Sequence, residues 1–255
     1  YLRNLGERRY GEDAIRSVLK FRGTLAQAAP AELAELTANA LIRKPDQQDR
    51  LRHGKREEPF EYYIDHGFLP ASPSQGPFLE LLTHSPQYGL ALIRQLVDHA
   101  ISFYSGRRDP SGDVITVVLR DDERSFPWTH SYYWSRDAHG NYSVTSGLMA
   151  LEVWAHRRIE AGESFNSVLS DVLGAAGSPA AYLLIAVDVI LSHWPRSRDS
   201  AIPFLAAPEL LSLDRERQMH DGFEYPDFLG LKALQKEPAG SASVADLKKR
   251  ESRKV

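Results

Sequence analysis

The segment Pro179–Trp194 (PAAYLLIAVDVILSHW) decides the fold class because it is the most apolar stretch of the chain. A membrane-spanning helix needs about 20 apolar residues, and this segment is shorter and carries Asp188 near its middle. We therefore interpret it as a helix buried on most sides in a protein core. The sequence predicts no membrane span and no association with a membrane.

The residues before this segment predict a helical hairpin. Phe165–Leu173 has the spacing of an amphipathic helix, Gly174–Gly177 turns the chain, and Ser178-Pro179 opens the next helix. The same order occurs earlier, where Pro77–Leu82 is followed by Ser85-Pro86 and a long apolar helix. This pattern predicts a mainly α protein built from stacked helical hairpins, either a HEAT-like α-solenoid or an irregular helical bundle.

Between the two hairpins the pattern changes to one typical of β-strands. Asp113–Arg120 is rich in β-branched residues, and Phe126–Arg136 contains an aromatic run. The turn signal Asp137–Asn141 follows, and Tyr142–Thr145 is placed to pair back as a further strand. We predict a small antiparallel β-meander inserted at residues 113–145 and packed on the neighbouring helices.

A charged stretch near residue 58 suggests how the chain is divided. Pro45–Pro59 contains few apolar residues, which is typical of a surface loop or linker. We predict an N-terminal helical segment with this linker at residues 1–58 and a helical-hairpin domain with the β-insert at residues 59–255. The chain starts with tyrosine rather than methionine, and its last predicted helix has little apolar surface, so we expect a fragment of a longer protein.

The composition excludes several classes of protein. The 255 residues contain no cysteine, so disulfide scaffolds, cysteine-ligated zinc sites and cysteine nucleophiles are excluded. Lys and Arg total 31 against 34 Asp and Glu, a net charge of −3, which excludes a bulk polycation but not a local basic patch. Nucleic-acid binding through Arg50–Arg56 and Lys248–Lys254 is the third and least favoured hypothesis. The basic run Arg50–Arg56 is interpreted as a solvated loop. The excess of Arg over Lys suggests a GC-rich bacterial genome, and the lack of thiols is compatible with the cytoplasm, where we place the protein.

Motifs that identify common enzymes are absent from the sequence. It contains no phosphate-binding loop, no dinucleotide fingerprint, no G-x-S-x-G elbow and no H-E-x-x-H pair. We therefore predict no catalytic residue, no metal and no cofactor. The leading hypothesis is a non-catalytic scaffold or recognition segment of a larger protein, which binds a protein partner or an adjoining domain of the same polypeptide.

Three polar residues on the most apolar helices support an alternative hypothesis. Glu152 and His156 lie four residues apart in the helix predicted at Gly147–Ala161, so they share one face. With Asp188 they are candidates for an enzyme site or a metal-binding site, and His193 is a further possible ligand. The same spacing of Glu152 and His156 also suits a simple side-chain hydrogen bond.

Asp188 is the most unusual single residue of the sequence. A buried carboxylate is costly unless it is paired or hydrogen-bonded. The favoured interpretation is an ion pair with an arginine from a neighbouring helix, with Arg157 and Arg158 as candidates. The functional alternative is an acid with a shifted pKa inside a pocket.

The aromatic run provides the candidate partner-binding residues. In a β-strand, alternate side chains share a face, so Trp128, His130, Tyr132 and Trp134 would form one stripe. Such a stripe can stack on a partner's side chain, a base or a sugar. The alternative is that the stripe simply buries itself on the adjacent helices.

Overall fold

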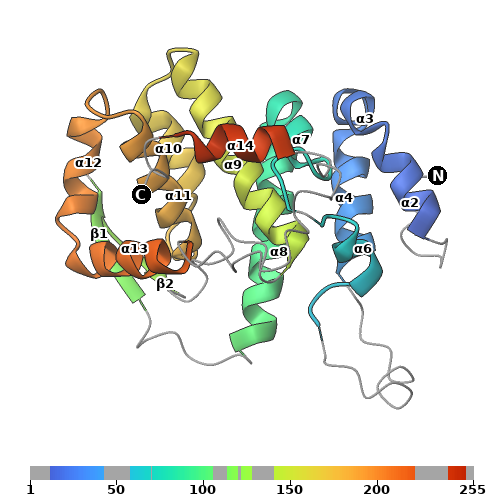
Figure 1. The fold of residues 1–255 in the computed structure, drawn as a ribbon, viewed down its shortest axis with the longest axis horizontal. Helices are drawn as coiled ribbons and strands as arrows, with labels where there is room; N and C mark the ends of the chain where they lie inside the picture. The colour runs from blue at the N-terminus through green and yellow to red at the C-terminus, as the bar shows by residue number, and fades with distance from the viewer. Residues whose placement is uncertain are drawn as a thin grey trace, which may run out of the picture.

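The computed structural model describes residues 12–42, 58–69, 71–105, 114–119, 122–127, 141–221 and 241–250. This part of the chain is mainly helical and contains one two-stranded antiparallel sheet. The N-terminal helices form one end of the molecule and the sheet lies at the other (Figure 1). The elements are α2 (Glu12–Leu19), α3 (Arg22–Ala28), α4 (Pro30–Leu41), α6 (Tyr62–His66), α7 (Phe78–His84), α8 (Pro86–Ser105), β1 (Val114–Leu119), β2 (Asp122–Pro127), α9 (Tyr142–Glu160), α10 (Phe165–Leu173), α11 (Ala181–Ser192), α12 (Arg198–Leu205), α13 (Pro208–Asp221) and α14 (Ser241–Lys248).

Proline marks the start of several helices. Pro30, Pro86 and Pro208 are the first residues of α4, α8 and α13, where the missing N–H costs no intrahelical hydrogen bond. The predicted helix over Phe165–Leu173 is confirmed as α10, and the apolar segment after it forms α11. Helices α7 and α8 pack on one another, as do α10 and α11, and all four contact α9. The mainly α prediction is therefore correct.

The predicted β-insert is only partly correct. Strands β1 and β2 form an antiparallel hairpin in which Ile115 lies opposite Phe126, and both side chains are buried. The predicted strand at Tyr142–Thr145 is wrong, because these residues form the first turn of α9. The second strand ends at Pro127, and residues 128–140 lie outside the described ranges.

A carboxylate from a distant helix explains why α9 begins at Tyr142. Asp65 of α6 accepts hydrogen bonds from the backbone N–H groups of Tyr142 (3.1 Å) and Ser143 (2.9 Å), and from the Ser143 hydroxyl (2.5 Å). The first N–H groups of a helix have no intrahelical acceptor, so this carboxylate satisfies them. Tertiary contacts thus override the local preference of Val144 and Thr145 for a strand.

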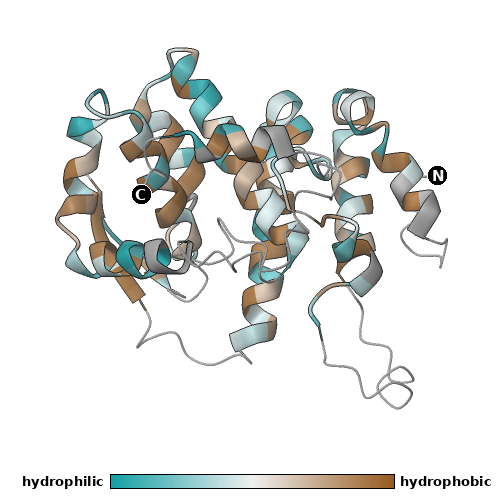
Figure 2. Ribbon diagram, viewed as in Figure 1, coloured by the Kyte–Doolittle hydropathy of each residue, from teal (hydrophilic) through white to brown (hydrophobic). Residues whose placement is uncertain are grey.

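One hydrophobic cluster runs through the described chain. Leu33 and Leu41 of α4 belong to the same cluster as Phe60 and Phe78, which follow residue 58. Hydrophobic residues, drawn in brown, occur on the helices from one end of the molecule to the other (Figure 2). The division near residue 58 stays a prediction. Within the described ranges, no helix is both long and apolar enough to pass through a bilayer.

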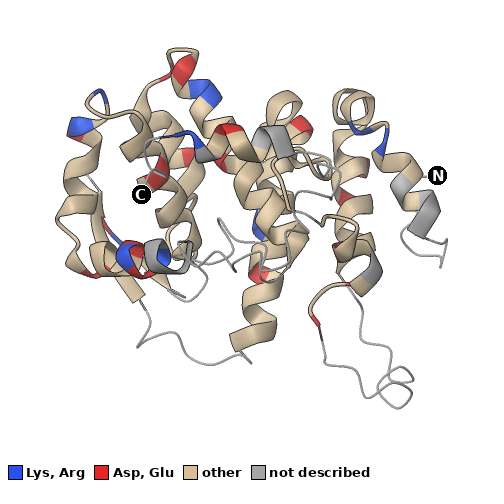
Figure 3. Cartoon of the chain, viewed as in Figure 1, with Lys and Arg blue, Asp and Glu red and all other residues tan. Residues whose placement is uncertain are grey.

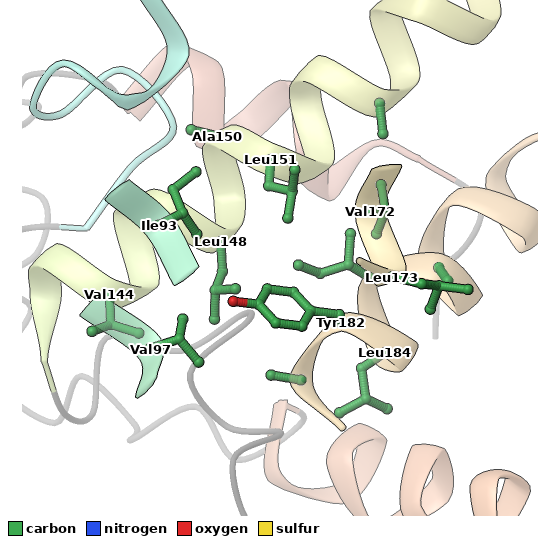
Figure 4. Packing of buried hydrophobic residues seen from close by; sticks show 14 of the residues in the cluster. Ile93, Val97, Val144, Leu148, Ala150, Leu151, Val172, Leu173, Tyr182 and Leu184 are labelled. Carbon is green, nitrogen blue, oxygen red and sulfur yellow. The ribbon is translucent and has the colours of Figure 1, made fainter. Parts of the chain in front are cut away.

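Tyr182 of α11 places an unsatisfied hydroxyl in this cluster. Its side chain points towards Leu148 of α9, with Val97 of α8 nearby (Figure 4), and it is 1% exposed. The hydroxyl has no hydrogen-bond partner among the described residues. Burial raises the pKa of Tyr182 well above its ordinary value, and Asp98 acts in the same direction.

Tyr182→Phe is therefore expected to raise the free energy of unfolding by about 1 kcal/mol, because it removes a buried hydroxyl without opening a large cavity. Chemical denaturation measures the change. Tyr104→Phe is the matched control, since the Tyr104 hydroxyl accepts a hydrogen bond from Asn141 (3.2 Å). The control is expected to lose up to about 1 kcal/mol. A comparable loss in Tyr182→Phe would contradict the assignment of an unsatisfied hydroxyl.

Candidate interaction groove

A groove of about 900 Å³ lies between the β-hairpin and helices α10 and α12. Its apolar lining includes Leu169 and Leu173 of α10 and Phe204 of α12, which are all buried. Val118 and Ile202 also line it, and they are 55% and 62% exposed. A concave apolar surface with a few polar groups is typical of a binding site.

Several polar side chains that line the groove already form hydrogen bonds within the protein. The Arg124 Nε atom donates to Asp122 (3.3 Å), and the Arg124 Nη1 atom donates to the backbone carbonyl of Gly174 (3.1 Å). The Ser200 hydroxyl donates to Asn166 (3.4 Å). Asp199 also lines the groove, and it forms no ion pair with any residue that the structure describes.

The sequence of α12 explains why apolar side chains remain exposed beside the groove. This eight-residue helix contains the apolar run Ala201–Leu205. One face of a helix cannot bury five consecutive side chains, because successive residues are about 100° apart. Ala201 and Phe204 face the core, whereas Ile202 and Leu205 are exposed. This apolar run is the sequence signal for the groove, which the sequence-based predictions did not include.

The candidate partner-binding residues Trp128, His130, Tyr132 and Trp134 lie outside the described residues. Their role stays a prediction. The hairpin before them is described up to Pro127, whose carbonyl accepts a hydrogen bond from the backbone N–H of Ala180 (2.8 Å). The basic run Arg50–Arg56 also lies outside the described ranges.

Glu152 and His156, which are buried, and His193, which is half-buried, form a polar chain between α9 and the end of α11. The His156 Nδ1 atom lies 3.0 Å from the His193 Nε2 atom, and the His156 Nε2 atom lies 3.6 Å from the Glu152 Oε1 atom. The two imidazoles are within hydrogen-bond distance, and the tautomer of each ring decides which of them donates. The sequence spacing correctly predicted that the Glu152 and His156 side chains lie together. The structure adds His193, which contacts His156.

The environment of His193 predicts how stability depends on pH. Burial lowers the pKa of His193 to about 4, and His156, Arg250 and Arg196 act in the same direction, whereas Glu160 opposes them. In the unfolded chain the imidazole regains a pKa of about 6.5. Between these values the unfolded state binds more protons, so this group lowers the free energy of unfolding as the pH falls from about 6.5 to about 4.

His193→Gln is expected to flatten this pH dependence. Urea denaturation at several values between pH 7 and pH 4 measures the free energy of unfolding of each variant. His84→Gln, at an exposed histidine of α7, is expected to keep the slope of the original chain. If His193→Gln lost as much stability as the original chain over the same range, His193 would not be the group responsible.

Asp188 forms an ion pair, as expected, but with a different arginine. Arg217 of α13 donates from Nη2 to the Asp188 Oδ1 atom (2.9 Å) and from Nη1 to the backbone carbonyl of Leu184 (3.1 Å). Arg217 also binds Asp214, one turn earlier. Acidic and basic residues lie next to each other on α13 (Figure 3). The structure therefore gives Asp188 a structural partner.

The predicted pairing of Asp188 with Arg157 or Arg158 is wrong. Arg158 instead bridges Glu163 (2.5 Å) and Asp171 (2.6 Å), and its guanidinium lies 4.3 Å from the ring centre of Trp154. Arg158 therefore makes its contacts near the molecular surface. Its partners are Trp154 of α9 itself, Glu163 just after α9, and Asp171 of α10.

The metal-site alternative receives no support from the geometry. No group of three or more His, Cys, Asp and Glu side chains in the described part of the chain is placed to hold a metal ion. Asp188 binds Arg217, and the Glu152, His156 and His193 side chains contact one another. No protein-family model matches this chain, and no curated protein matches it either.

Proposed function

We propose that this chain is a non-catalytic helical scaffold or recognition segment that acts through protein–protein interaction. Large exposed apolar side chains at one end of the molecule carry this proposal. They lie on β1, on α11 and the turn after it, and on α12 and α13, elements that pack on one another. Large exposed apolar surfaces are typical of interaction sites. The side chains are Val118, Leu191, Trp194, Ile202, Leu205 and Leu211.

The helical pairs are part of the same proposal. We infer that α7–α8 and α10–α11 are two hairpins of a solenoid-like stack with α9 between them, because both pairs contact α9. In each pair a Ser-Pro dipeptide precedes or opens the second helix: Ser85-Pro86 at the start of α8, and Ser178-Pro179 just before α11. Stacked hairpins present a broad surface rather than a closed catalytic cavity, which favours a role in docking.

The titratable core residues favour this function over an enzyme. Asp188 and Arg217 neutralise each other inside the protein. Glu152, His156 and His193 form their own chain, and none of these five residues lines the groove. A catalytic site would place such groups where a substrate can reach them.

Selection from a library of displayed random 12-residue peptides tests the proposed function. Peptides enriched on the purified chain are expected to bind Ile202→Asp at least tenfold more weakly, because the exposed Ile202 side chain would lose its apolar contact. Leu69→Asp is the matched control, since Leu69 is also an exposed aliphatic residue but lies outside the groove. Unfolding midpoints of both variants verify that they fold.

Two results would refute the proposed function. One is a selection that enriches no peptide. The other is a set of enriched peptides that bind Ile202→Asp as well as they bind Leu69→Asp, because the apolar surface around the groove would then not be used.

A further inference from the structure

We propose that the groove between the β-hairpin and α12 binds a partner segment in which large apolar side chains lie beside a lysine or arginine. This inference rests on the proposed function, because it names the chemistry of the protein segment that would dock there. The apolar part of the segment would cover the groove lining, and the basic side chain would bind at Asp199.

The apolar part follows from the lining. Leu169, Leu173 and Phe204 close the inner side of the groove, and Val118 and Ile202 present their exposed side chains at its rim. A partner that covers the two rim residues removes apolar area from water, which is the main source of favourable free energy in such contacts.

The charge of the groove favours a basic partner over an acidic one. Three charged residues line it, and two of them, Asp122 and Arg124, form an ion pair. Arg124 is further held by the Gly174 carbonyl. Asp199 is exposed and forms no ion pair within the described part of the chain, so the groove keeps one net negative charge. A cation is the complementary group.

The helix around Asp199 is interrupted by a proline, and the Asp199 carboxylate is the acceptor on which the inference rests. Pro203 lies inside α12 and has no N–H to donate to the carbonyl of Asp199, four residues earlier. Both residues line the groove. The Asp199 carboxylate favours a donor-rich cation such as an ammonium or guanidinium group. The exposed Arg196 and Arg198 are close in sequence but do not line the groove.

The other polar groups fit a peptide backbone. Asn166 and Ser170 line the groove from α10, and Ser200 lines it from α12. Amide and hydroxyl groups can each donate and accept hydrogen bonds, as the backbone of a bound segment requires. Ser200 and Asn166 already share one hydrogen bond, but each keeps further donor or acceptor capacity that a lipid chain could not use, which favours a protein segment over a lipid.

The charges of selected peptides test this inference. Peptides that are enriched on the original chain, and that depend on Ile202, are expected to carry more Lys and Arg than Asp and Glu. For these peptides, Asp199→Asn is expected to weaken binding by up to about fivefold, the upper end of the range of an exposed ion pair. Glu35→Gln, at an exposed acid of α4, is the control and is expected to leave binding unchanged.

Reversing the charge at position 199 provides a second, independent test. Repeating the selection on Asp199→Lys is expected to enrich acidic peptides instead, and the preference of the original chain is expected to weaken at high salt. Peptides that depend on Ile202 but are acidic, or are insensitive to Asp199→Asn, would overturn this inference while the proposed function stands. If no peptide is enriched at all, both fall.

Discussion

Asp188→Ala is expected to lower the free energy of unfolding by about 3 to 5 kcal/mol, the largest effect of any single substitution considered for this chain. The reason is that Arg217 stays buried after its main carboxylate partner is removed. Arg217 is 1% exposed, and removing Asp188 leaves a buried guanidinium with Asp214 as its remaining carboxylate partner among the described contacts. Urea denaturation at pH 7 measures the change.

Two further variants separate two contributions to the free energy of unfolding. One is the cost of leaving a buried charge without its partner, and the other is the net stabilisation that the ion pair provides. The double variant Asp188→Leu with Arg217→Met is expected to be more stable than Asp188→Ala, because it removes the buried guanidinium together with the buried carboxylate. Glu163→Ala breaks the exposed contact with Arg158 and is expected to cost less than about 1 kcal/mol. If Asp188→Ala cost no more than Glu163→Ala, the buried pair would contribute little to stability.

Gly89→Ala is expected to destabilise the protein by about 2 to 3 kcal/mol. Helix α8 approaches α7 so closely at Gly89 that an added Cβ atom would lie 2.7 Å from the backbone nitrogen of Leu82 and 3.0 Å from its Cα atom. Backbone atoms cannot move aside as a flexible side chain can, so the two helices would have to separate. Overpacking of this kind typically costs 1–3 kcal/mol.

Gly23→Ala provides the matched control for this substitution. Gly23 lies in α3, and a Cβ atom added there meets no heavy atom within 4 Å. Alanine has the higher helix propensity, so a gain of about 0.5 kcal/mol is expected. The midpoints of thermal unfolding measure both variants. A stable Gly89→Ala protein would show that α7 and α8 are not in such close contact.

Local sequence patterns predicted most helices but misassigned the start of α9. Proline at a first helical position and apolar residues at helical spacing are local signals, and they located α4, α8 and α10. The start of α9 depends on Asp65, which lies 77 and 78 residues before the N–H groups it accepts from. No local pattern reports such a contact, so the propensity of Val144 and Thr145 wrongly indicated a strand.

The candidate site was predictable to a different degree in each of its parts. The spacing of Glu152 and His156 was sufficient to place them together on α9. The partner of Asp188 could not be predicted, because Arg217 lies in a polar stretch that resembles a solvated helix face. Only the packing of α13 near α11 shows that this arginine is buried. The groove depends on three separated segments, which the sequence alone does not bring together.

The contacts of the N-terminal helices have a consequence for how the chain is held together. Helix α3 packs on α7, α4 packs on α8, and Arg22 binds both Glu80 (2.9 Å) and the backbone carbonyl of Ser74 (3.2 Å). These interactions are non-covalent and join residues on both sides of the segment 43–57. A single proteolytic nick in that segment would therefore leave two fragments that stay associated and co-purify.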